Sequence, residues 1–161
     1  MEIREVRPEE YVAAGRVTLE AWEEFYGIEA LGSYAERLRD IGARVRGAVV
    51  LVALEEGDVV GTATYVPGPS SPYSEQLRAG EAGLRMLSVA PERKRQGIGR
   101  ALSLACIDRA RAEGKTALVL HADQIMSASQ RLYESLGFHR DPSRDFAPDR
   151  QTSLLCYALT L

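Results

Sequence analysis

The feature that most constrains the fold is the segment 81–102, EAGLRMLSVAPERKRQGIGRAL. It begins with an apolar run that predicts a buried strand, and Pro91 ends this run. A basic cluster follows, and Gly97 and Gly99 then open a predicted helix. A glycine turn between a strand and a helix directs unpaired backbone N–H groups to one spot, beside the positive end of the helix dipole. The segment therefore predicts an anion site that suits phosphate, because glycines without Cβ atoms let an anion reach the backbone.

Other mechanisms share a Gly-x-Gly turn of this kind. The dinucleotide-binding fingerprint needs a third glycine where this chain has Leu102, and the nucleotide P-loop needs a Gly-Lys-Ser/Thr ending that this segment lacks. A glycine turn that binds nothing, with a solvated basic run beside it, is the remaining interpretation of the Gly-x-Gly pattern taken alone.

The residues around the turn carry a more specific pattern. Leu87-Ser88-Val89 is followed by a Pro-Glu pair, by a basic residue three places before Gly97, and then by Ile-Gly. Together they resemble the Arg/Gln-x-x-Gly-x-Gly/Ala motif of the GNAT superfamily of N-acetyltransferases, with Lys94 where Arg or Gln is usual. The resemblance implies that the backbone of this loop binds the pyrophosphate of coenzyme A. The cofactor-binding residues that it implies are Leu87, Ser88, Val89, Lys94, Arg95, Gln96, Gly97, Ile98, Gly99, Arg100 and Ser129.

A second segment, 126–138, resembles the other signature of the same family, Asn-x-x-Ala-x-x-Leu-Tyr-x-x-x-Gly-Phe. It matches at Tyr133 and at the Gly-Phe pair, and it departs at Met126 and Ser129, which replace the usual Asn and Ala. A helix tyrosine considered alone would indicate a core aromatic, and the Gly-Phe context changes that interpretation. By resemblance, Tyr133 is the catalytic residue, a general acid that protonates the departing thiolate of coenzyme A.

Length and composition limit the class of protein. The chain has 161 residues and a net charge of −3, and no apolar run approaches the length that spans a membrane. Its first ten residues are charged and lack the apolar core of a signal peptide. We therefore expect one domain over residues 1–161, a cytoplasmic location, and neither membrane nor nucleic acid as a partner. Cys106 and Cys156 lack metal-ligand spacing, so we expect buried free thiols and no metal site.

Strand and helix patterns alternate along the chain. Apolar or alternating runs predict strands near 3–6, 49–54, 59–66, 81–89, 116–120, from 138 and at 153–161. Helical periodicity predicts helices near 8–24, 34–41, 97–113 and 127–136, the last with a capping box of Ser127 and Gln130. Glu56-Gly57-Asp58 is a hairpin signal. This order matches the GNAT fold, an α/β (α+β) class with a mixed central sheet of about seven strands and helices on both faces.

The resemblance implies direct transfer of an acetyl group from acetyl-CoA to a primary amine of a small molecule or peptide. A non-catalytic acyl-CoA sensor of the same fold is the alternative. The base that deprotonates the amine is left open between Glu81, His121 and an ordered water. The first helices and the loops 67–80 and 141–151 are expected to form the acceptor pocket, although the acidic and aromatic residues of those helices are equally explained as a solvated face and a core. The C-terminal sequence looks similar to bacterial family members without an assignable substrate. The alternating pattern of the last strands would allow a homodimer to form by pairing at their edge.

Overall fold

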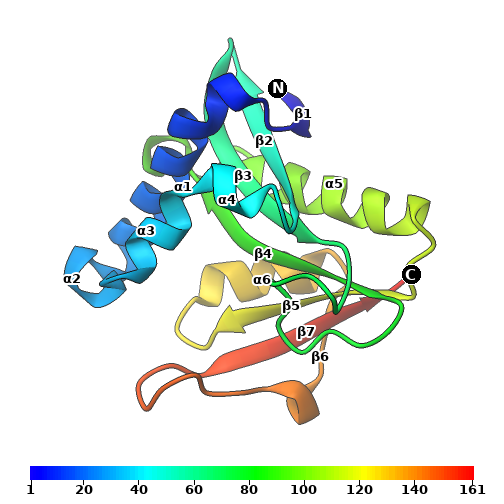
Figure 1. The fold of residues 1–161 in the computed structure, drawn as a ribbon. Helices are drawn as coiled ribbons and strands as arrows, with labels where there is room; N and C mark the ends of the chain where they lie inside the picture. The colour runs from blue at the N-terminus through cyan, green and yellow to red at the C-terminus, as the bar shows by residue number, and fades with distance from the viewer. The chain divides into compact units, whose positions relative to one another are not determined.

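The computed structural model describes residues 1–161, and its elements are labelled in Figure 1. Seven strands form one sheet in the order β1-β2-β3-β4-β5-β7-β6, which confirms the mixed seven-stranded prediction. β4 and β5 pair in parallel, whereas β1–β2, β2–β3, β5–β7 and β6–β7 are antiparallel. The strands are β1 (Glu2–Glu5), β2 (Val49–Glu55), β3 (Asp58–Val66), β4 (Glu81–Val89), β5 (Ala117–Asp123), β6 (His139–Arg140) and β7 (Leu154–Thr160). The α-helices are α1 (Tyr11–Tyr26), α2 (Ile28–Leu31), α3 (Tyr34–Arg39), α4 (Ile41–Arg44), α5 (Ile98–Ala112) and α6 (Ser127–Ser135).

Three short 3-10 helices, η1 (Pro8–Glu10), η2 (Pro91–Arg93) and η3 (Pro142–Arg144), each begin at a proline. Proline fits the first helical position because its fixed φ suits a helix and its missing N–H would have no partner there. No helix of the structure has both the length and the apolar character that crossing a membrane requires.

The chain divides into two compact units. The first unit comprises residues 1–65 and 86–106, and the second comprises residues 66–85 and 107–161. The expectation of a single domain over residues 1–161 stays a prediction.

In the first unit, helices cover both faces of β3. Thr18 on α1 shares a 2.8 Å hydrogen bond with Thr62. A Cβ atom at the adjacent Gly61 would lie 2.7 Å from Ile98 and 3.0 Å from Leu102, both on α5. Because neighbouring residues of a strand point to opposite faces, α1 and α5 pack on opposite faces of β3. The predicted placement of helices on both faces is confirmed for this strand.

The hairpin between β2 and β3 is also confirmed. Its two turn residues, Glu56 and Gly57, both have left-handed backbones, with φ of 51° and 85°. This is the conformation of a type I′ turn, whose twist matches that of the strands it joins.

In the second unit, β5 lies between β4 and β7. Its antiparallel register with β7 runs from Ala117 opposite Thr160 to Asp123 opposite Leu154. The predicted strand ended at Leu120 with His121 at its exit, and that boundary is wrong. Pairing with β7 continues past this point, so His121 lies inside the strand opposite Cys156.

The predicted capping box of α6 is wrong. Met126 is the N-cap residue, and no side chain caps the helix. The side chain of Gln130 is engaged elsewhere, because its Nε2 donates to the carbonyls of Asp123 at 3.2 Å and Gln124 at 2.9 Å. Gln130 therefore closes the turn that precedes the helix instead of capping its first residue.

The helix predicted near 34–41 is interrupted at Asp40, where α3 has ended and α4 begins. The Asp40 carboxylate accepts the N–H of Ala43 at 3.0 Å and so caps α4. At the other predicted helix ends, Gly114 and Gly137 have positive φ, as expected after α5 and α6.

Cys106 and Cys156 are free and buried, which confirms the prediction of buried free thiols.

Replacing Gly15 with alanine should destabilise the first unit by about 1–3 kcal/mol, the usual range for overpacking. A Cβ atom at Gly15 on α1 would lie 2.2 Å from the carbonyl oxygen of Arg39, a backbone atom that cannot rotate away. Urea unfolding of the Gly15→Ala variant measures this loss. The matched control is Gly42→Ala, where the nearest atom to a new Cβ is 3.7 Å away. Equal stability of the two variants would contradict close α1–α3 packing.

Candidate active site

The second half of β4 has an irregularity that the sequence did not reveal. Met86 has a left-handed backbone with φ of 53°, which is unusual for a large non-glycine residue in a strand. The parallel register with β5 covers the residues before this point, from Glu81 opposite Ala117 to Gly83 opposite Val119. After Met86, the side chains of Leu87 and Val89 are half-buried. Ser88 between them is buried, and its hydroxyl donates a hydrogen bond to the Met86 carbonyl at 3.1 Å.

The loop between β4 and α5 has the geometry of an anion site. Arg95 and Gly97 both have left-handed backbones, with φ of 65° and 81°. No backbone N–H from Arg95 to Gly99 donates to a backbone carbonyl, and Ile98 and Gly99 open α5. Left-handed turns and helix N-termini both present N–H groups that can converge on an anion. The structure therefore places the predicted loop residues together in the first unit, with donors available.

Basic side chains beside this loop are paired with acids of the same unit. Lys94 Nζ lies 2.8 Å from Glu24 Oε1 on α1, and Arg93 pairs with Glu55 at the end of β2. Both pairs are partly exposed, so each contributes about 0–1 kcal/mol. Lys94, which replaces the usual Arg or Gln of the motif, thus forms an ion pair with α1 in this structure.

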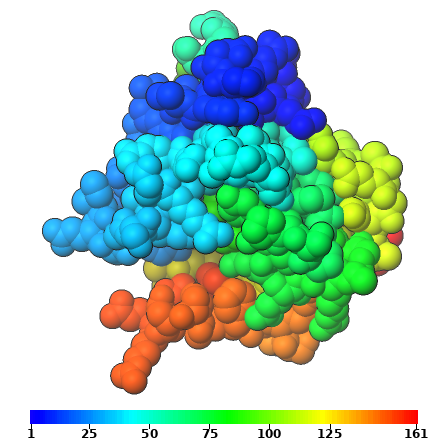
Figure 2. All heavy atoms as spheres, in the orientation of Figure 1, coloured from blue at the N-terminus to red at the C-terminus, as the bar shows by residue number.

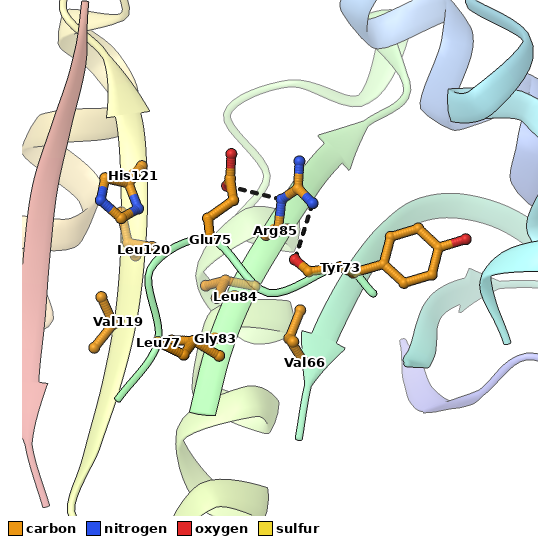
Figure 3. Close-up of a pocket in the computed structure, with 10 residues that line it drawn as sticks. All are labelled: Val66, Tyr73, Glu75, Leu77, Gly83, Leu84, Arg85, Val119, Leu120 and His121. Atoms are coloured by element: carbon orange, nitrogen blue, oxygen red, sulfur yellow. Dashed lines mark hydrogen bonds and ion pairs between the residues drawn. The ribbon is translucent and has the colours of Figure 1, made fainter. Parts of the chain in front are cut away.

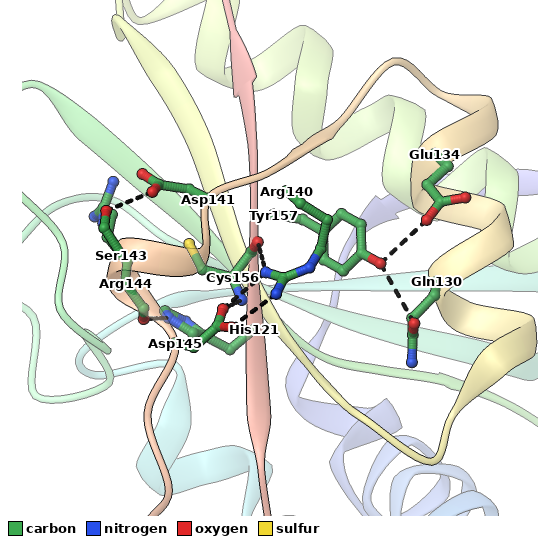
Figure 4. A network of polar contacts seen from close by, with 10 residues as sticks. All are labelled: His121, Gln130, Glu134, Arg140, Asp141, Ser143, Arg144, Asp145, Cys156 and Tyr157. Atoms are coloured by element: carbon green, nitrogen blue, oxygen red, sulfur yellow. Dashed lines mark hydrogen bonds and ion pairs between the residues drawn. The ribbon is translucent and has the colours of Figure 1, made fainter.

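Tyr133 lies in the second unit, where two aromatic rings hold its side chain. It is buried on α6, and its ring lies 5.7 Å from Phe138 in an edge-on arrangement and 6.4 Å from Tyr157. The Tyr157 hydroxyl approaches Glu134 at 3.2 Å and Gln130 at 3.4 Å, both on α6 (Figure 4). Because Tyr157 belongs to β7, these bonds fix the helix that carries Tyr133 against the sheet. Ser129 lies on the first turn of α6.

Arg140 and Asp145 form a charged network beside Tyr157. Arg140 makes two 2.7 Å hydrogen bonds to the Asp145 carboxylate, and its guanidinium carbon lies 5.5 Å from the centre of the Tyr157 ring. The Cys156 N–H also donates to Asp145 at 2.7 Å. Hydrogen bonds from Arg140 and from this N–H outweigh partial burial and lower the pKa of the Asp145 carboxyl. The network therefore holds the loop after β6 against β7.

The second unit also contains a pocket with a polar wall. The loop 67–80, green at the surface in Figure 2, contributes Glu75, and β4 contributes Arg85. Arg85 Nε lies 2.8 Å from Glu75 Oε1, and its Nη1 donates to the Tyr73 carbonyl at 2.9 Å (Figure 3). His121 lies at another wall. The lining residues are Val66, Tyr73, Glu75, Leu77, Gly83, Leu84, Arg85, Val119, Leu120 and His121.

The two side chains that the sequence left open as the base have different surroundings. Glu81 accepts two hydrogen bonds from Arg144, at 2.7 and 3.0 Å, and a third from the Arg78 N–H at 2.8 Å. Partial burial raises the pKa of the Glu81 carboxyl, but these bonds outweigh it and the pKa lies below its ordinary value. A carboxylate that is bound by an arginine and weakly basic is poorly suited to accept a proton.

At His121, burial has a stronger effect on the pKa than hydrogen bonding, which is the reverse of the balance at Glu81. Burial is the main influence on its imidazole and lowers the pKa below 6.5, against a smaller opposite effect from its bond to the Arg144 carbonyl. Its Nε2 lies 3.1 Å from that carbonyl oxygen, and its ring packs edge-on against Phe146 at 5.0 Å. At neutral pH the ring is therefore uncharged and able to accept a proton.

Replacing Arg144 with methionine should destabilise the protein by about 3–5 kcal/mol, because it leaves the largely buried Glu81 carboxylate without its partner. The pKa of Glu81 is lower in the folded protein than the ordinary value of 4.5, so the wild-type ion pair stabilises the fold above about pH 4.5. This contribution is lost as the pH falls through the folded-state pKa of Glu81. The stability difference between wild type and variant should shrink over that range. Denaturant unfolding at several pH values measures it.

The double variant Glu81→Gln/Arg144→Met is the control, since it removes both charges. It should be more stable than Arg144→Met alone at neutral pH. A single variant as stable as wild type would contradict the importance of this ion pair.

The aromatic residues expected near an acceptor pocket fall into two groups. Trp22, Tyr26 and Tyr34 pack around a core cluster of the first unit that contains Leu31, Leu38 and Met86. Tyr73 lines the pocket of the second unit. Packing against this cluster favours the core interpretation for the first group, whereas Phe25, which was also expected near the pocket, is exposed.

The buried position of Arg144 could not be predicted from the sequence, in which 141–151 is a polar loop. An arginine in a polar loop is ordinarily exposed, and no local pattern marks it as buried and paired with a residue 63 positions earlier.

Comparison with known proteins places this geometry in a family. The model of the acetyltransferase (GNAT) family matches residues 15–138. Mycothiol acetyltransferase of Kocuria rhizophila is 36% identical over 111 residues, covering 68% of this chain and 35% of that protein. The solved ribosomal-protein-alanine N-acetyltransferase of Brucella melitensis is 30% identical with a TM-score of 0.76, covering 100% of both chains. The structure of yncA from Salmonella typhimurium with its cofactor acetyl-CoA is 25% identical with a TM-score of 0.71, covering 99% of this chain and 93% of that one.

The chain spans less than half the length of the curated relatives that it matches, between 16% and 41% of each. The family model, in contrast, covers both motifs and the strands and helices between them, from α1 to the Gly-Phe pair before β6. The chain belongs to the acetyltransferase (GNAT) family.

Proposed function

We propose that this protein is an N-acetyltransferase that moves an acetyl group from acetyl-CoA to a primary amine of a small molecule or peptide by direct transfer. The observation that carries the proposal is the loop before α5. Its left-handed backbone at Arg95 and Gly97 lies beside a helix N-terminus, with N–H groups that bond to no backbone carbonyl. Such a group of donors suits the pyrophosphate of coenzyme A.

The residues of this loop fit that cofactor. A Cβ atom at Gly97 would meet no atom within 4 Å, so the space above the backbone is open. In the proposal, the N–H groups from Arg95 to Arg100 hold the pyrophosphate, and Leu87 and Val89 on β4 hold the pantetheine arm. Lys94, Ser88 and Ser129 complete the proposed cofactor-binding set. The bound cofactor would supply an acetyl group activated as a thioester.

Tyr133 is the proposed general acid. A phenol with a pKa near 10 can share its proton with a thiolate whose conjugate acid has a pKa of about 8.5 as negative charge develops on sulfur. The rings of Phe138 and Tyr157 support this role because they restrict the orientation of the Tyr133 side chain.

The acceptor is proposed as an amine without a fixed identity. The Brucella melitensis protein, which matches over the full length of both chains, is named for the alanine of a ribosomal protein. The Kocuria rhizophila protein is named for mycothiol. An alanyl peptide is therefore the first acceptor to test, followed by small-molecule amines.

Isothermal titration of acetyl-CoA and coenzyme A into the purified protein tests the cofactor part of the proposal. Micromolar affinity for both compounds is expected, with coenzyme A retaining most of the affinity because it carries the same pyrophosphate. Heat changes no larger than those of dilution would overturn the proposal.

A further inference from the structure

Arg85 is a charged side chain in a mostly apolar pocket of the second unit. Only 16% of this side chain is exposed. A guanidinium in such surroundings needs an anionic partner, because burial removes the water that would otherwise solvate its charge. The partner in this structure is Glu75, whose Oε1 lies 2.8 Å from Arg85 Nε (Figure 3). The apolar residues that line the same pocket are Val66, Leu77, Leu84, Val119 and Leu120.

The carboxylate in this pocket comes from a loop and not from the sheet. Glu75 belongs to the loop 67–80, and 26% of its side chain is exposed to solvent. With the ion pair formed, the pocket has room for about one water molecule. A larger ligand can therefore enter only if Glu75 moves out. The Glu75 carboxylate marks the place that the carboxylate of such a ligand would take.

The position of Glu75 differs from that of the other carboxylates that bind arginines in this unit. Glu81 is the first residue of β4, and Asp145 also accepts the Cys156 N–H of β7 at 2.7 Å. Both carboxylates are thus tied to strands of the sheet. Glu75 is tied to the sheet through Arg85 itself, so a carboxylate from solution can compete with it for Arg85.

The part of the loop that precedes Glu75 is folded on itself. Two backbone hydrogen bonds, of 3.2 and 3.0 Å, close successive turns within residues 68–74. Arg85 connects this folded part to β4, because its Nη1 also donates to the Tyr73 carbonyl at 2.9 Å. Residues 68–75 can therefore move toward Arg85 or away from it as one body.

The part of the loop that follows Glu75 is anchored. The Gln76 carbonyl accepts a hydrogen bond from Arg144 at 2.8 Å. Leu77 packs against Gly83, where a Cβ atom would lie 3.3 Å from the Leu77 side chain. Gln76 has a left-handed backbone with φ of 58°, a strained conformation for a residue other than glycine. A rotation at this residue would relieve the strain and carry the preceding carboxylate out of the pocket.

We propose that this pocket binds a small aliphatic carboxylate on Arg85, and that Glu75 is an internal competitor that keeps the site closed until the ligand replaces it. The ligand carboxylate forms the ion pair that Glu75 gives up, and the aliphatic part of the ligand contacts the apolar lining. A guanidinium suits this ligand because its planar fork of N–H groups can face both carboxylate oxygens. Binding makes and breaks no covalent bond, and it does not depend on the proposed acetyl transfer.

Propionate is the probe for this site, because it reproduces the glutamate side chain beyond Cα. Nuclear magnetic resonance of the protein with ¹⁵N-labelled arginine follows the Nε–H signal of Arg85, which an Arg85→Lys variant assigns. We expect a saturable shift with half-saturation in the millimolar range, since a tethered Glu75 competes at a millimolar effective concentration. 1-Propanol and sodium chloride should give no saturable shift. An Arg85 signal that responds to propionate no more than to sodium chloride, both in wild type and in Glu75→Gln, would overturn the proposal.

Glu75→Gln tests the internal competitor. The variant removes the charge that pairs with Arg85 and keeps the size of the side chain, so propionate should bind about 10-fold more tightly. Backbone hydrogen exchange of residues 68–75 should be faster in this variant, and also in wild type saturated with propionate, because both lose the contact that holds the loop. Equal propionate affinity in wild type and Glu75→Gln would overturn the role of Glu75.

The matched control is Glu36→Gln. It removes the charge of an exposed glutamate that pairs with Arg39 outside this pocket. Propionate affinity at Arg85 should be the same in this variant as in wild type, and the Arg39 signal should respond to propionate no more than to sodium chloride. A gain in propionate affinity equal to that of Glu75→Gln would show a general effect of net charge and would overturn the proposal. The titration with acetyl-CoA is a separate measurement, so either result leaves the proposed function to its own test.

Discussion

Replacing Gly97 with valine should weaken acetyl-CoA binding about 10- to 100-fold, which corresponds to roughly 1.4–2.8 kcal/mol. Gly97 has a φ of 81°, where an L-residue is strained by about 1–2 kcal/mol and a β-branched side chain fits poorly. The loop can relieve this strain only by rotating its peptide units, which turns the N–H groups away from a common point. A new side chain would also occupy the open space above the backbone. Isothermal titration of acetyl-CoA measures the loss.

Gly57→Val is the matched control. Gly57 has nearly the same backbone, with a φ of 85°, and a Cβ atom there also meets nothing within 4 Å. Both variants should lose similar stability in urea unfolding because the strain is the same. Only Gly97→Val should lose affinity, since Gly57 lies in the β2–β3 hairpin. Equal affinity of the two variants for acetyl-CoA would contradict an anion site at the loop before α5.

Replacing Tyr133 with phenylalanine should lower turnover about 100- to 1,000-fold while acetyl-CoA affinity changes less than about threefold. The substitution removes the proton donor but keeps the ring that packs against Phe138 and Tyr157, so the fold should remain intact. Steady-state thiol release and calorimetry together separate the two effects. The variant also distinguishes an enzyme from a non-catalytic acyl-CoA sensor, because a sensor has no turnover to lose.

Tyr157→Phe is the control for general loss of a buried hydroxyl in the same aromatic cluster. It removes the contacts with Glu134 and Gln130 and should lower stability by about 1 kcal/mol. Its turnover should fall much less than that of Tyr133→Phe. Similar rates in the two variants would show that aromatic packing, and not the Tyr133 proton, matters for the reaction.

The parts of the molecule that depend on local sequence could be predicted. The glycine turn before α5 and the hairpin at Glu56 and Gly57 follow from the conformations that only a few residue types adopt readily. Apolar runs marked β2, β3 and β4 because buried strands need them. The second motif indicated Tyr133 through its neighbours along the chain, and the role of Tyr133 as a general acid stays a prediction.

Features that depend on distant contacts could not be predicted. Nothing in an apolar run signals the left-handed backbone of Met86, because methionine is ordinarily stable in a strand. The capping box at Ser127 failed because Gln130 instead bonds to the carbonyls of the preceding turn. The different surroundings of Glu81 and His121 could not be predicted either, because both depend on Arg144, whose side chain binds Glu81 and whose carbonyl binds His121.

The most direct test of the account is acetyl transfer itself. The purified protein is incubated with acetyl-CoA and an acceptor panel that begins with an alanyl peptide, and thiol release is measured alongside mass spectrometry of the acceptors. We expect thiol release that depends on the acceptor, and one added acetyl group on an amine of that acceptor. Tight binding of acetyl-CoA with no thiol release and no acetylated amine across the panel would contradict it, and would favour a non-catalytic acyl-CoA sensor.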